Sequence, residues 1–382
     1  MREGWDLVKL GSLCDIQNGF AFDSKLFNND GKGLPLIRIR DIKRGYSETF
    51  TTEECDNAYI VKDGDYLIGM DGEFNIGQWK SENALLNQRV CKLLPSSKIL
   101  PRFIYYYIPK ALKDIEAKTA YATVKHLSSK QIKEISIPNL PLPEQQRIVD
   151  VLDQEFAKID ALKANAEKSL QAAKDLFLQM LAHTFANPSW SWKRIGDVFD
   201  TGAGGTPLKT YQEYYENGDI PWLRSGEVCK KYITETEMFI TQLGMDNSSA
   251  KMFPENTVVV AMYGATAGQV GILHLATTTN QAVCGIFPKE DYVPEFIYYS
   301  LLNSKKGLVA QATGNAQPNI SQIKIKNTLV PVISRKEQEE VVSNLDDLND
   351  RCNCLFDNYQ KTISLCDDLK QSLLRKAFNG EL

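Results

Sequence analysis

The stretch RIRDIKRG places four cations, Arg38, Arg40, Lys43 and Arg44, within seven residues. An arginine side chain can bridge the O6 and N7 atoms of guanine, and both lysine and arginine bind phosphate. The alternation predicts that Arg38 and Arg40 share one face of a strand. This cluster therefore suits contact with nucleic acid. A solvated edge strand that carries charges against aggregation would give the same pattern.

Three further groups extend this candidate chemistry. A second, weaker basic run contains Arg224, Lys230 and Lys231. Two glycine-bearing loops, MDGEFNIGQWK and MYGATAGQVG, follow strand-like runs, and glycine lets a backbone approach a ligand closely. The candidates in these loops are Asn75, Lys80, Tyr263 and Thr266. A tight hairpin without a ligand explains the loops equally well.

Two other features favour architecture over recognition. The polar segments KTAYATVKHLSSKQIK and QATGNAQPNISQIKIK each run into lysines, and we interpret them as parts of the fold rather than as base-reading loops. Phe103, Tyr105 and Tyr106 have the chemistry for base stacking. Their helical spacing beside Ile104 instead predicts a core face.

The sequence gives little support for a catalytic, metal or cofactor-binding site. NPSW (187–190) falls where a helix should stop, DTGAGGTP lacks the helix of a dinucleotide fold, and no phosphate-binding GxxxxGK[ST] motif occurs. His126, His183 and His274 have no ligand neighbours at metal-site spacing, and the eight cysteines include no CxxC pair. We therefore expect no catalytic residue, no metal and no cofactor in this chain.

Composition is that of an ordinary soluble protein, with 43 % apolar and 24 % charged residues among 382. We expect a cytoplasmic protein without a membrane span, since neither a long apolar run nor a signal-peptide pattern is present. The net charge of −4 argues mildly against nucleic acid. The acidity lies mostly on two predicted helices, however, and phosphates respond to the local field.

The sequence contains an internal duplication. With a constant offset of 193 residues, the segment from Asn87 to about Asn187 aligns without a gap onto the segment from Asn280. Asn87-Gln88 recurs as Asn280-Gln281, and FIYY recurs from Phe296. Upstream, Trp5 with Leu10-Gly11 pairs with Trp192 with Ile195-Gly196. A period near 190 is too long for a solenoid and indicates a duplicated domain with its helix.

Each copy has short, irregular strand-like runs followed by one long helix, about 144–186 and 337–379. The predicted fold class is α+β, with two mixed β-rich domains joined by two long antiparallel helices in a coiled coil with pseudo-twofold symmetry. The predicted boundaries are 1–142 and 188–335 for the β-rich domains and 143–187 and 336–382 for the helices.

Apolar residues on the two helices recur every 3.5 residues, which is the pattern of paired helices. The predicted seam consists of Ile148, Leu152, Ile159, Leu162, Ala166, Ala173 and Leu176 on the first helix, and Leu345, Leu348, Leu355, Tyr359, Leu369 and Leu373 on the second. Antiparallel packing would set Ala166 near Leu355 and Ala173 near Leu348, while Glu155 and Ser169 interrupt the seam.

An alternative is that each helix folds back onto its own β domain. A helix of about 43 residues would measure about 65 Å, which exceeds the roughly 30–40 Å diameter of a 140-residue domain. The length favours a spacer that holds the two domains apart.

Three motifs resemble those of specificity subunits of type I restriction–modification systems. TGAGGTPLKTYQEYYENGDIPWLRSGEV (201–228) resembles the GGTP…IPW opening of a target-recognition domain in that family. PLPEQQRIV and RKEQEEVV resemble the entry of its spacer helices, and LLRKAFNGEL resembles its C-terminal end. The resemblance covers essentially the whole chain. The first copy, SLCDIQNGFAFDSKLFNNDGKGLPLIR, departs from it because GGTP is missing.

The resemblance implies a non-catalytic reader of double-stranded DNA. Each recognition domain would bind one half of a bipartite site, and the helix pair would fix the gap between the halves. Two methyltransferase subunits and the restriction and translocase subunits would be the protein partners, and S-adenosylmethionine, ATP and Mg would act in those partners.

Two other classes of protein remain as alternatives. One is a duplicated coiled-coil scaffold that binds only proteins, which would show no salt-dependent binding to random duplex DNA. The other is a stand-alone nuclease or methyltransferase, which predicts activity without partners.

Overall fold

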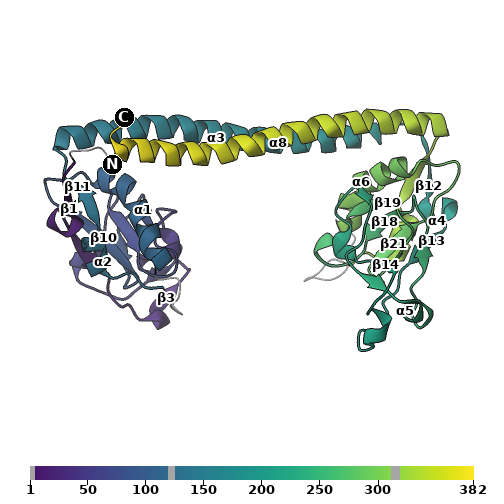
Figure 1. The fold of residues 1–382 in the computed structure, drawn as a ribbon, viewed down its shortest axis with the longest axis horizontal. Helices are drawn as coiled ribbons and strands as arrows, with labels where there is room; N and C mark the ends of the chain where they lie inside the picture. The colour runs from purple at the N-terminus through teal and green to yellow at the C-terminus, as the bar shows by residue number, and fades with distance from the viewer. Residues whose placement is uncertain (1–4, 119–124, 311–318) are drawn as a thin grey trace. The chain divides into compact units, whose positions relative to one another are not determined.

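The structure, a computed structural model, describes residues 5–118, 125–310 and 319–382. The chain forms two compact units. Unit 1 contains residues 1–166 and 361–382, and unit 2 contains residues 167–360. Each unit therefore holds one β-rich domain and one end of each of two long helices, α3 (Leu142–Thr184) and α8 (Arg335–Asn379) (Figure 1).

Unit 1 is built on two sheets and a ribbon. A four-stranded antiparallel sheet has the order β2-β10-β7-β8, a five-stranded sheet has the order β3-β5-β4-β9-β6, and β1 pairs with β11. The strands are β1 (Leu7–Lys9), β2 (Cys14–Asn18), β3 (Phe27–Asn28), β4 (Leu34–Ile37), β5 (Phe50–Thr51), β6 (Ile60–Val61), β7 (Tyr66–Gly69), β8 (Ile76–Gln78), β9 (Ala84–Leu86), β10 (Val90–Pro95) and β11 (Ser136–Pro138). The helices are α1 (Pro101–Lys118) and α2 (Ser129–Lys133).

Unit 2 repeats this plan. Its sheets have the orders β13-β21-β18-β19-β15 and β16-β14-β20-β17, and β12 pairs with β22. The strands are β12 (Ser191–Arg194), β13 (Thr201–Ala203), β14 (Ile220–Leu223), β15 (Tyr232–Ile233), β16 (Phe239–Ile240), β17 (Met252–Phe253), β18 (Val258–Ala261), β19 (Val270–Leu273), β20 (Thr277–Thr279), β21 (Val283–Ile286) and β22 (Leu329–Val332). The helices are α4 (Ile195–Val198), α5 (Gln242–Asp246), α6 (Pro294–Ala310) and α7 (Gln322–Asn327).

The main core of each unit lies between one sheet, β2-β10-β7-β8 in unit 1 and β13-β21-β18-β19-β15 in unit 2, and a covering helix, α1 or α6. Both long helices complete that core. In unit 1 it includes Leu152 of α3 and Ala377 of α8, and in unit 2 it includes Leu181 of α3 and Leu345 of α8. Each β domain therefore packs on helix ends that come from both halves of the sequence.

A buried glutamine ties each long helix to its domain. In unit 1 Gln145 donates to the carbonyls of Lys98 and Leu140, while its Oε1 accepts from the Leu100 amide at 2.8 Å. Gln338 makes the same three contacts in unit 2, including one from the Val293 amide at 2.9 Å. Because these bonds satisfy backbone groups of the preceding segments, the helix can begin directly after a strand. This is the structural reason for the glutamine in the Glu-Gln pair at each helix entry.

Strand registers define the repeat and correct one part of the predicted alignment. Leu7 pairs with Pro138 across the β1–β11 ribbon, and Trp192 pairs with Pro331 across β12–β22. Leu7, not Trp5, is therefore the counterpart of Trp192. Trp190 takes the place corresponding to Trp5 and is buried, with its indole N–H donating to Glu337 at 2.8 Å. Alignment by sequence fails here because two tryptophans lie two residues apart.

Within each unit the two long helices run antiparallel. In unit 1 Lys163 pairs with Asp367 at 2.7 Å, and Lys370 pairs with Asp160. In unit 2 the ammonium of Lys174 lies 4.8 Å from the ring centre of Phe356. The predicted pairing of Ala173 with Leu348 is therefore wrong, because Phe356, not Leu348, lies beside this turn. The predicted pairing of Ala166 with Leu355 is also wrong. Lys163, in the preceding turn of α3, pairs with Asp367, which lies well beyond Leu355 on α8.

Half of the predicted seam is buried and half is not. The buried seam residues on α3 are Ile148 and four positions seven residues apart, Leu152, Ile159, Ala166 and Ala173. On α8, Leu345 is buried. Leu348, Tyr359 and Leu373 are half-buried. The predicted seam residues that are exposed instead are Leu162, Leu176, Leu355 and Leu369.

The error comes from the step between the buried positions. A helix of 3.6 residues per turn allows a step of either three or four after each one. The predicted seam uses a step of three, which leads from Leu152 to Glu155 and from Ile159 to Leu162. A step of four leads instead from Leu152 to Phe156 and from Ala173 to Phe177, and both phenylalanines pack against the cores. The polar interruption at Glu155 was the available sign that the step was wrong.

Substitution of two seam leucines tests this packing. We expect Leu152→Ala to lower the free energy of unfolding by about 2–5 kcal/mol, because its side chain is fully buried. Leu162→Ala is the matched control, since that side chain is 51 % exposed, and its cost should stay within about 0.5 kcal/mol. Urea unfolding followed by circular dichroism measures both. Equal costs would contradict the revised seam.

Candidate DNA-binding surfaces

The candidate site in each unit forms where two parallel strands end together. Ile37 of β4 pairs with Leu86 of β9 in unit 1, and Leu223 of β14 pairs with Thr279 of β20 in unit 2. The residues that follow these strands are Arg38 with Asn87-Gln88 and Arg224 with Asn280-Gln281. Parallel pairing therefore brings an arginine turn next to an Asn-Gln turn. We call this arrangement the strand-end cluster.

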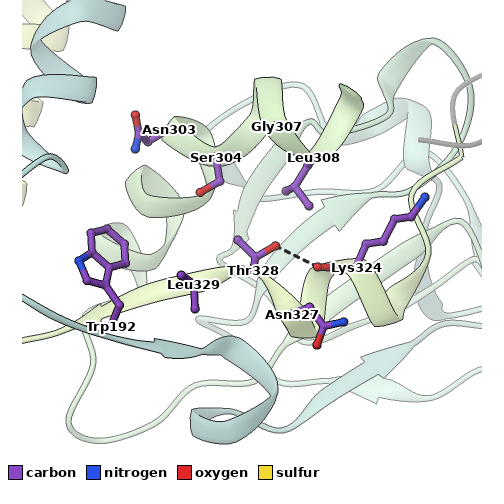
Figure 2. Close-up of a pocket in the computed structure, with 9 residues that line it drawn as sticks. All are labelled: Trp192, Asn303, Ser304, Gly307, Leu308, Lys324, Asn327, Thr328 and Leu329. Atoms are coloured by element: carbon purple, nitrogen blue, oxygen red, sulfur yellow. Dashed lines mark hydrogen bonds between the residues drawn. The ribbon is translucent and has the colours of Figure 1, made fainter. Parts of the chain in front are cut away.

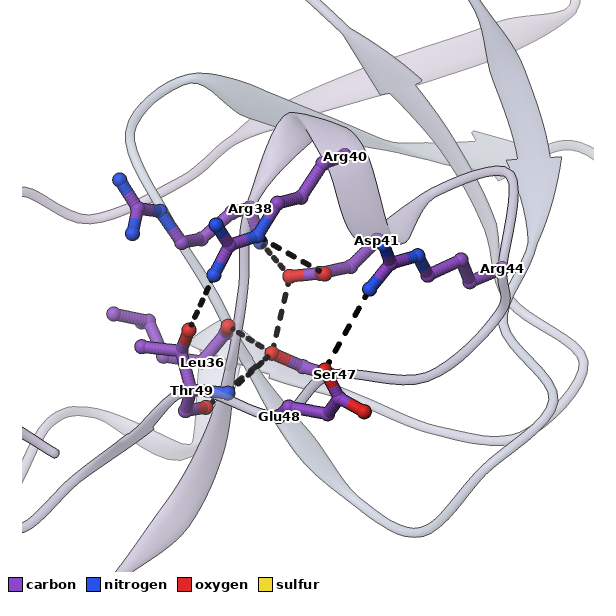
Figure 3. Close-up of polar contacts among 8 residues, drawn as sticks. All are labelled: Leu36, Arg38, Arg40, Asp41, Arg44, Ser47, Glu48 and Thr49. Carbon is purple, nitrogen blue, oxygen red and sulfur yellow. Dashed lines mark hydrogen bonds and ion pairs between the residues drawn. The ribbon is translucent and has the colours of Figure 1, made fainter. Parts of the chain in front are cut away.

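The arginine turn of unit 1 is organised by a buried carboxylate (Figure 3). Asp41 is 1 % exposed and accepts hydrogen bonds from the Arg38 amide at 2.9 Å and the Ser47 hydroxyl at 3.0 Å. The Arg40 guanidinium lies 3.7 Å from the same carboxylate and donates to Thr49 at 3.1 Å. Buried carboxylates of this kind fix the local backbone because leaving their partners unsatisfied is costly.

The predicted strand through Arg38 and Arg40 is not present. β4 ends at Ile37, and Ile39–Asp41 forms a 3₁₀ turn, so the two arginines do not share a strand face. The carboxylate of Asp41 competes for the backbone amide and ends the strand. Figure 3 shows the Arg38 guanidinium pointing away from the Asp41 network.

The other two cations of the turn have acidic neighbours. Arg44 lies 3.7 Å from Glu48, and Lys43 lies 2.7 Å from Glu73. These pairs are exposed and weak, so both side chains can exchange a carboxylate for phosphate. The segment from Arg38 to Thr49 carries four cations against two carboxylates and is locally basic.

Unit 2 repeats the turn with a glutamate. The Arg224 amide and its Nε both donate to Glu227 Oε1 at 3.1 Å, and the guanidinium also pairs with Glu237. Ser225–Glu227 forms the equivalent 3₁₀ turn. Lys230 is exposed nearby.

A loop that alignment by sequence missed completes the cluster. In unit 2 the amides of Gly204 and Gly205 donate to the carbonyls of Val283 and Thr279 at 3.2 and 2.8 Å. In unit 1 Gly19 and Phe20 make the same bonds to Val90 and Leu86 at 3.1 and 2.8 Å. The first copy therefore contains the counterpart of the GGTP loop, with Phe20 in place of the second glycine.

The glycines of GGTP are required by close packing. A Cβ atom on Gly204 would lie 2.0 Å from Thr279 Oγ1, and one on Gly205 would lie 2.3 Å from the Ala250 amide nitrogen. Real Cβ contacts of that length do not occur. The recurring Asn-Gln pair was the sequence signal for this part of the site, because in each unit the residues on either side of the pair bond the loop.

The predicted glycine-bearing loops adjoin the same cluster. The Met262 amide donates to Ala282 at 2.8 Å, directly after Gln281, and Lys43 reaches Glu73 of the first loop. Tyr263 is exposed, and Thr266 is half-buried. The Asn75 Oδ1 atom is buried without a hydrogen-bond partner among the described residues, while its Nδ2 donates to the Glu73 carbonyl at 3.1 Å.

Lys80 belongs to a separate basic hollow of unit 1. Its amide donates to the Gly45 carbonyl at 2.9 Å, so it adjoins the arginine turn. The hollow has a volume of about 430 Å³ and its charged lining residues are Lys43, Lys80, Arg102, Asp153, Asp160 and Lys370. Four cations against two carboxylates make this surface attractive to phosphate. Arg102 and Lys370 were not among the sequence candidates.

Lys231 has a structural role, and we do not retain it as a DNA contact. Its ammonium pairs with Asp346 of α8 and lies 4.8 Å from the ring centre of Tyr299. Burial and the hydrogen bond to Asp346 raise the pKa of Tyr299. In unit 1 Arg102 takes the same place, bonding Asp153 at 2.7 Å. Burial alone would lower the pKa of Arg102, but the hydrogen bonds to Asp153 and Tyr66 and the charges of Tyr106 and Asp153 together raise it.

The aromatic residues and polar segments singled out in the sequence serve the fold. Phe103 and Tyr106 are buried in the core and are not stacking platforms, as predicted. Residues 119–124 and 311–318 of the two polar segments lie outside the described residues. In the described parts, His126 contacts Asp71 at 2.6 Å, and Ser128 and Ser321 cap α2 and α7, which are structural contacts.

A different hollow of unit 2 lies between α6, α7 and β22 (Figure 2). It has a volume of about 590 Å³ and is lined by Trp192, Leu308 and Leu329 among others, with Lys324 its only cation. Trp192 and Leu329 are exposed, whereas Leu308 is buried. This chemistry suits a protein contact better than a nucleic acid.

The described residues offer neither a metal site nor a membrane span. In residues 5–118, 125–310 and 319–382, no three His, Cys, Asp or Glu side chains gather as a metal site would need. None of the helices described combines the length and apolarity that crossing a bilayer requires.

Comparison with known proteins agrees with the duplicated architecture. The family model for the type I restriction modification DNA specificity domain matches residues 2–172 and again residues 187–363. A solved structure described as showing complex assembly and conformational transition of the type I R-M system matches with a TM-score of 0.76 at 19 % identity, covering 100 % of this chain and 99 % of that one. The HsdS subunit from Thermoanaerobacter tengcongensis matches with a TM-score of 0.57 at 17 % identity, covering 100 % and 98 %.

Curated relatives extend the match to sequence. The EcoBI specificity subunit of Escherichia coli is 31 % identical over an alignment of 420 positions, which covers 100 % of this chain and 87 % of that protein. The EcoR124I/EcoR124II specificity subunit of the same species is 25 % identical, covering 82 % and 80 %. With both halves of the chain matched and the fold shared, this protein belongs to the family of type I restriction–modification specificity subunits.

Proposed function

We propose that this chain is the DNA-reading, non-catalytic subunit of a type I restriction–modification complex. The observation that carries the proposal is the strand-end cluster, which occurs in both units. It joins an arginine turn, an Asn-Gln turn and the GGTP loop or its counterpart. Arginine, asparagine and glutamine are the side chains that make bidentate contacts to base edges. In unit 1 the basic hollow beside the cluster supplies phosphate contacts.

Each unit reads one half of a bipartite site. We assign residues 1–142 and 188–335 to the two recognition domains. The charges of the two clusters differ, since the Arg38 turn is basic and the Arg224 turn has three cations against three carboxylates up to Glu237. Two readers with different side chains recognise different sequences, which gives an asymmetric site. The long helices set the gap between the half-sites, because α3 and α8 each contribute to both units.

Two methyltransferase subunits bind along the exposed helix surface, and the restriction and translocase subunits join through the complex. Leu162 and Leu369 in unit 1 and Leu176 and Leu355 in unit 2 are exposed on the long helices. These leucines would supply apolar contact area to a protein partner that covers both helices. S-adenosylmethionine, ATP and Mg act in these partners, and the complex works in the cytoplasm. A scaffold that binds proteins alone accounts for these leucines but not for the strand-end clusters.

Removal of phosphate-binding cations tests DNA contact. Arg38→Ala combined with Lys80→Ala should weaken binding of the methyltransferase complex to random duplex DNA. It should also lower the slope of log K against log salt by about one for each phosphate that is no longer neutralised. Lys98→Ala is the control, because Lys98 lies beyond the opposite end of β10 from the Asn-Gln turn. A wild-type complex with no salt slope would instead support the scaffold.

Lengthening the helices tests the gap. Insertion of one helical turn into both α3 and α8 should change the number of base pairs between the half-sites and leave both half-sites intact, because the readers are untouched. Methylome sequencing of a host that expresses the complex gives the half-sites and the gap together. An unchanged gap would refute this role of the helices.

Exchange of one domain tests independent reading. Replacement of residues 1–142 by the corresponding domain of a relative should change one half-site only, because the other reader keeps its own side chains. Methylation motifs of the hybrid complex report the outcome, and a change in both half-sites would count against the proposal.

A further inference from the structure

The strand-end cluster of unit 2 lines a hollow. It has a volume of about 370 Å³ and is lined by Thr206, Lys209, Tyr215, Trp222, Arg224, Met238, Asn280 and Gln281. These eight residues include two cations and no carboxylate. The buried face of Trp222 forms an apolar floor, and Lys209 and Gln281 are exposed at the rim.

The loop above this hollow is fixed by side chains. The Trp222 indole N–H donates to the Gly205 carbonyl at 3.0 Å, and the Tyr215 hydroxyl donates to the Pro207 carbonyl. The Thr206 hydroxyl bonds Gln281 Oε1. This bond fixes the orientation of the Gln281 side-chain amide, whose NH₂ group carries two donors. The site is therefore held in shape before anything binds, which lowers the entropy cost of recognition.

Two glutamates hold the guanidinium of Arg224 in place. Glu227 is largely buried and bonds the Arg224 backbone amide, the Arg224 Nε and the Glu237 amide, the last at 2.8 Å. Glu237 is 71 % exposed and bonds the guanidinium itself. Both carboxylates line a neighbouring hollow rather than this one. They bind Arg224, which lines the hollow, without lining it themselves.

The charged groups that line the hollow, the ammonium of Lys209 and the guanidinium of Arg224, are hydrogen-bond donors, and the NH₂ group of Gln281 adds two further donors. The major-groove edge of guanine carries two acceptors, O6 and N7, whereas adenine and cytosine each present an amino donor there. We propose that this hollow reads a guanine in the half-site bound by unit 2, with Arg224 as a specificity-determining residue and Glu237 as its positioning residue. The inference rests on the DNA-reading function proposed above.

Unit 1 provides the contrast. Phe20 stands where unit 2 has Gly205, is partly exposed, and packs 5.3 Å from Tyr59 and 5.0 Å from Phe22, measured between ring centres. Ala21 stands in place of Thr206, so the hydroxyl that bonds the glutamine in unit 2 has no counterpart at this position. Substitutions in the hollow of unit 2 should therefore leave the half-site of unit 1 unchanged.

The experiment measures methyl transfer by the complex to duplexes in which each base pair of each half-site is varied in turn. Arg224→Lys and Glu237→Ala should each reduce the preference for guanine at one position of one half-site by about tenfold or more, because the bidentate donor pair is absent or misaligned. Glu235→Ala is the matched control, since it removes a carboxylate of the same hollow as Glu237. It should leave the preference unchanged.

The other outcomes are distinct. Uniform loss of methyl transfer across all duplexes in Arg224→Lys would show a phosphate contact and overturn the guanine assignment, as would a change in the half-site of unit 1. An intact preference at the unit 1 half-site shows that each variant is folded. A wild-type complex without any half-site preference would overturn the proposed function itself.

Discussion

Each β-rich domain can close its main core only against two helix ends that are far apart in the sequence. Leu152 and Ala377 contribute to the core of unit 1, and Leu181 and Leu345 contribute to that of unit 2. The aromatic ring of Phe378 lies 5.6 Å from that of Phe103 and 5.0 Å from that of Tyr107. Because apolar burial is the main stabilising term in folding, the helices and the domains stabilise one another. This dependence explains why each half of the sequence contains both a domain and a helix.

The same packing positions the reading surface. Asp153 and Asp346 project from the long helices and bind Arg102 and Lys231 of the domains. In each case a tyrosine, Tyr106 or Tyr299, bonds the same carboxylate. The two units reach this arrangement with cations from different elements, α1 in one and the segment before β15 in the other. A duplicated site has kept its carboxylate and tyrosine while the cation has changed its origin.

The duplication, the fold class and the long helices could be predicted from sequence, because a gap-free repeat and a 3.5-residue period are global signals. The turn at Arg38 could not, since it depends on a buried carboxylate three residues away, and alternation of charges resembles a strand. The counterpart of GGTP was hidden because its backbone bonds, not its side chains, are retained in Gly19 and Phe20. The seam was half right because Glu155 was treated as a flaw rather than as a sign that the step should be four. Among the basic candidates, Lys231 looked like its neighbour Lys230, and only its partner on α8 separates them.

Unit 1 is discontinuous, and this has a consequence for synthesis on the ribosome. Its first 166 residues emerge early, but Ala377 and the aromatic ring of Phe378 emerge only after all of unit 2. Contacts over such a separation form slowly because loop closure must precede them. The nascent N-terminal unit therefore exposes an unfinished apolar face until Ala377 and Phe378 have been made. The part of the chain made first is the last to be completed.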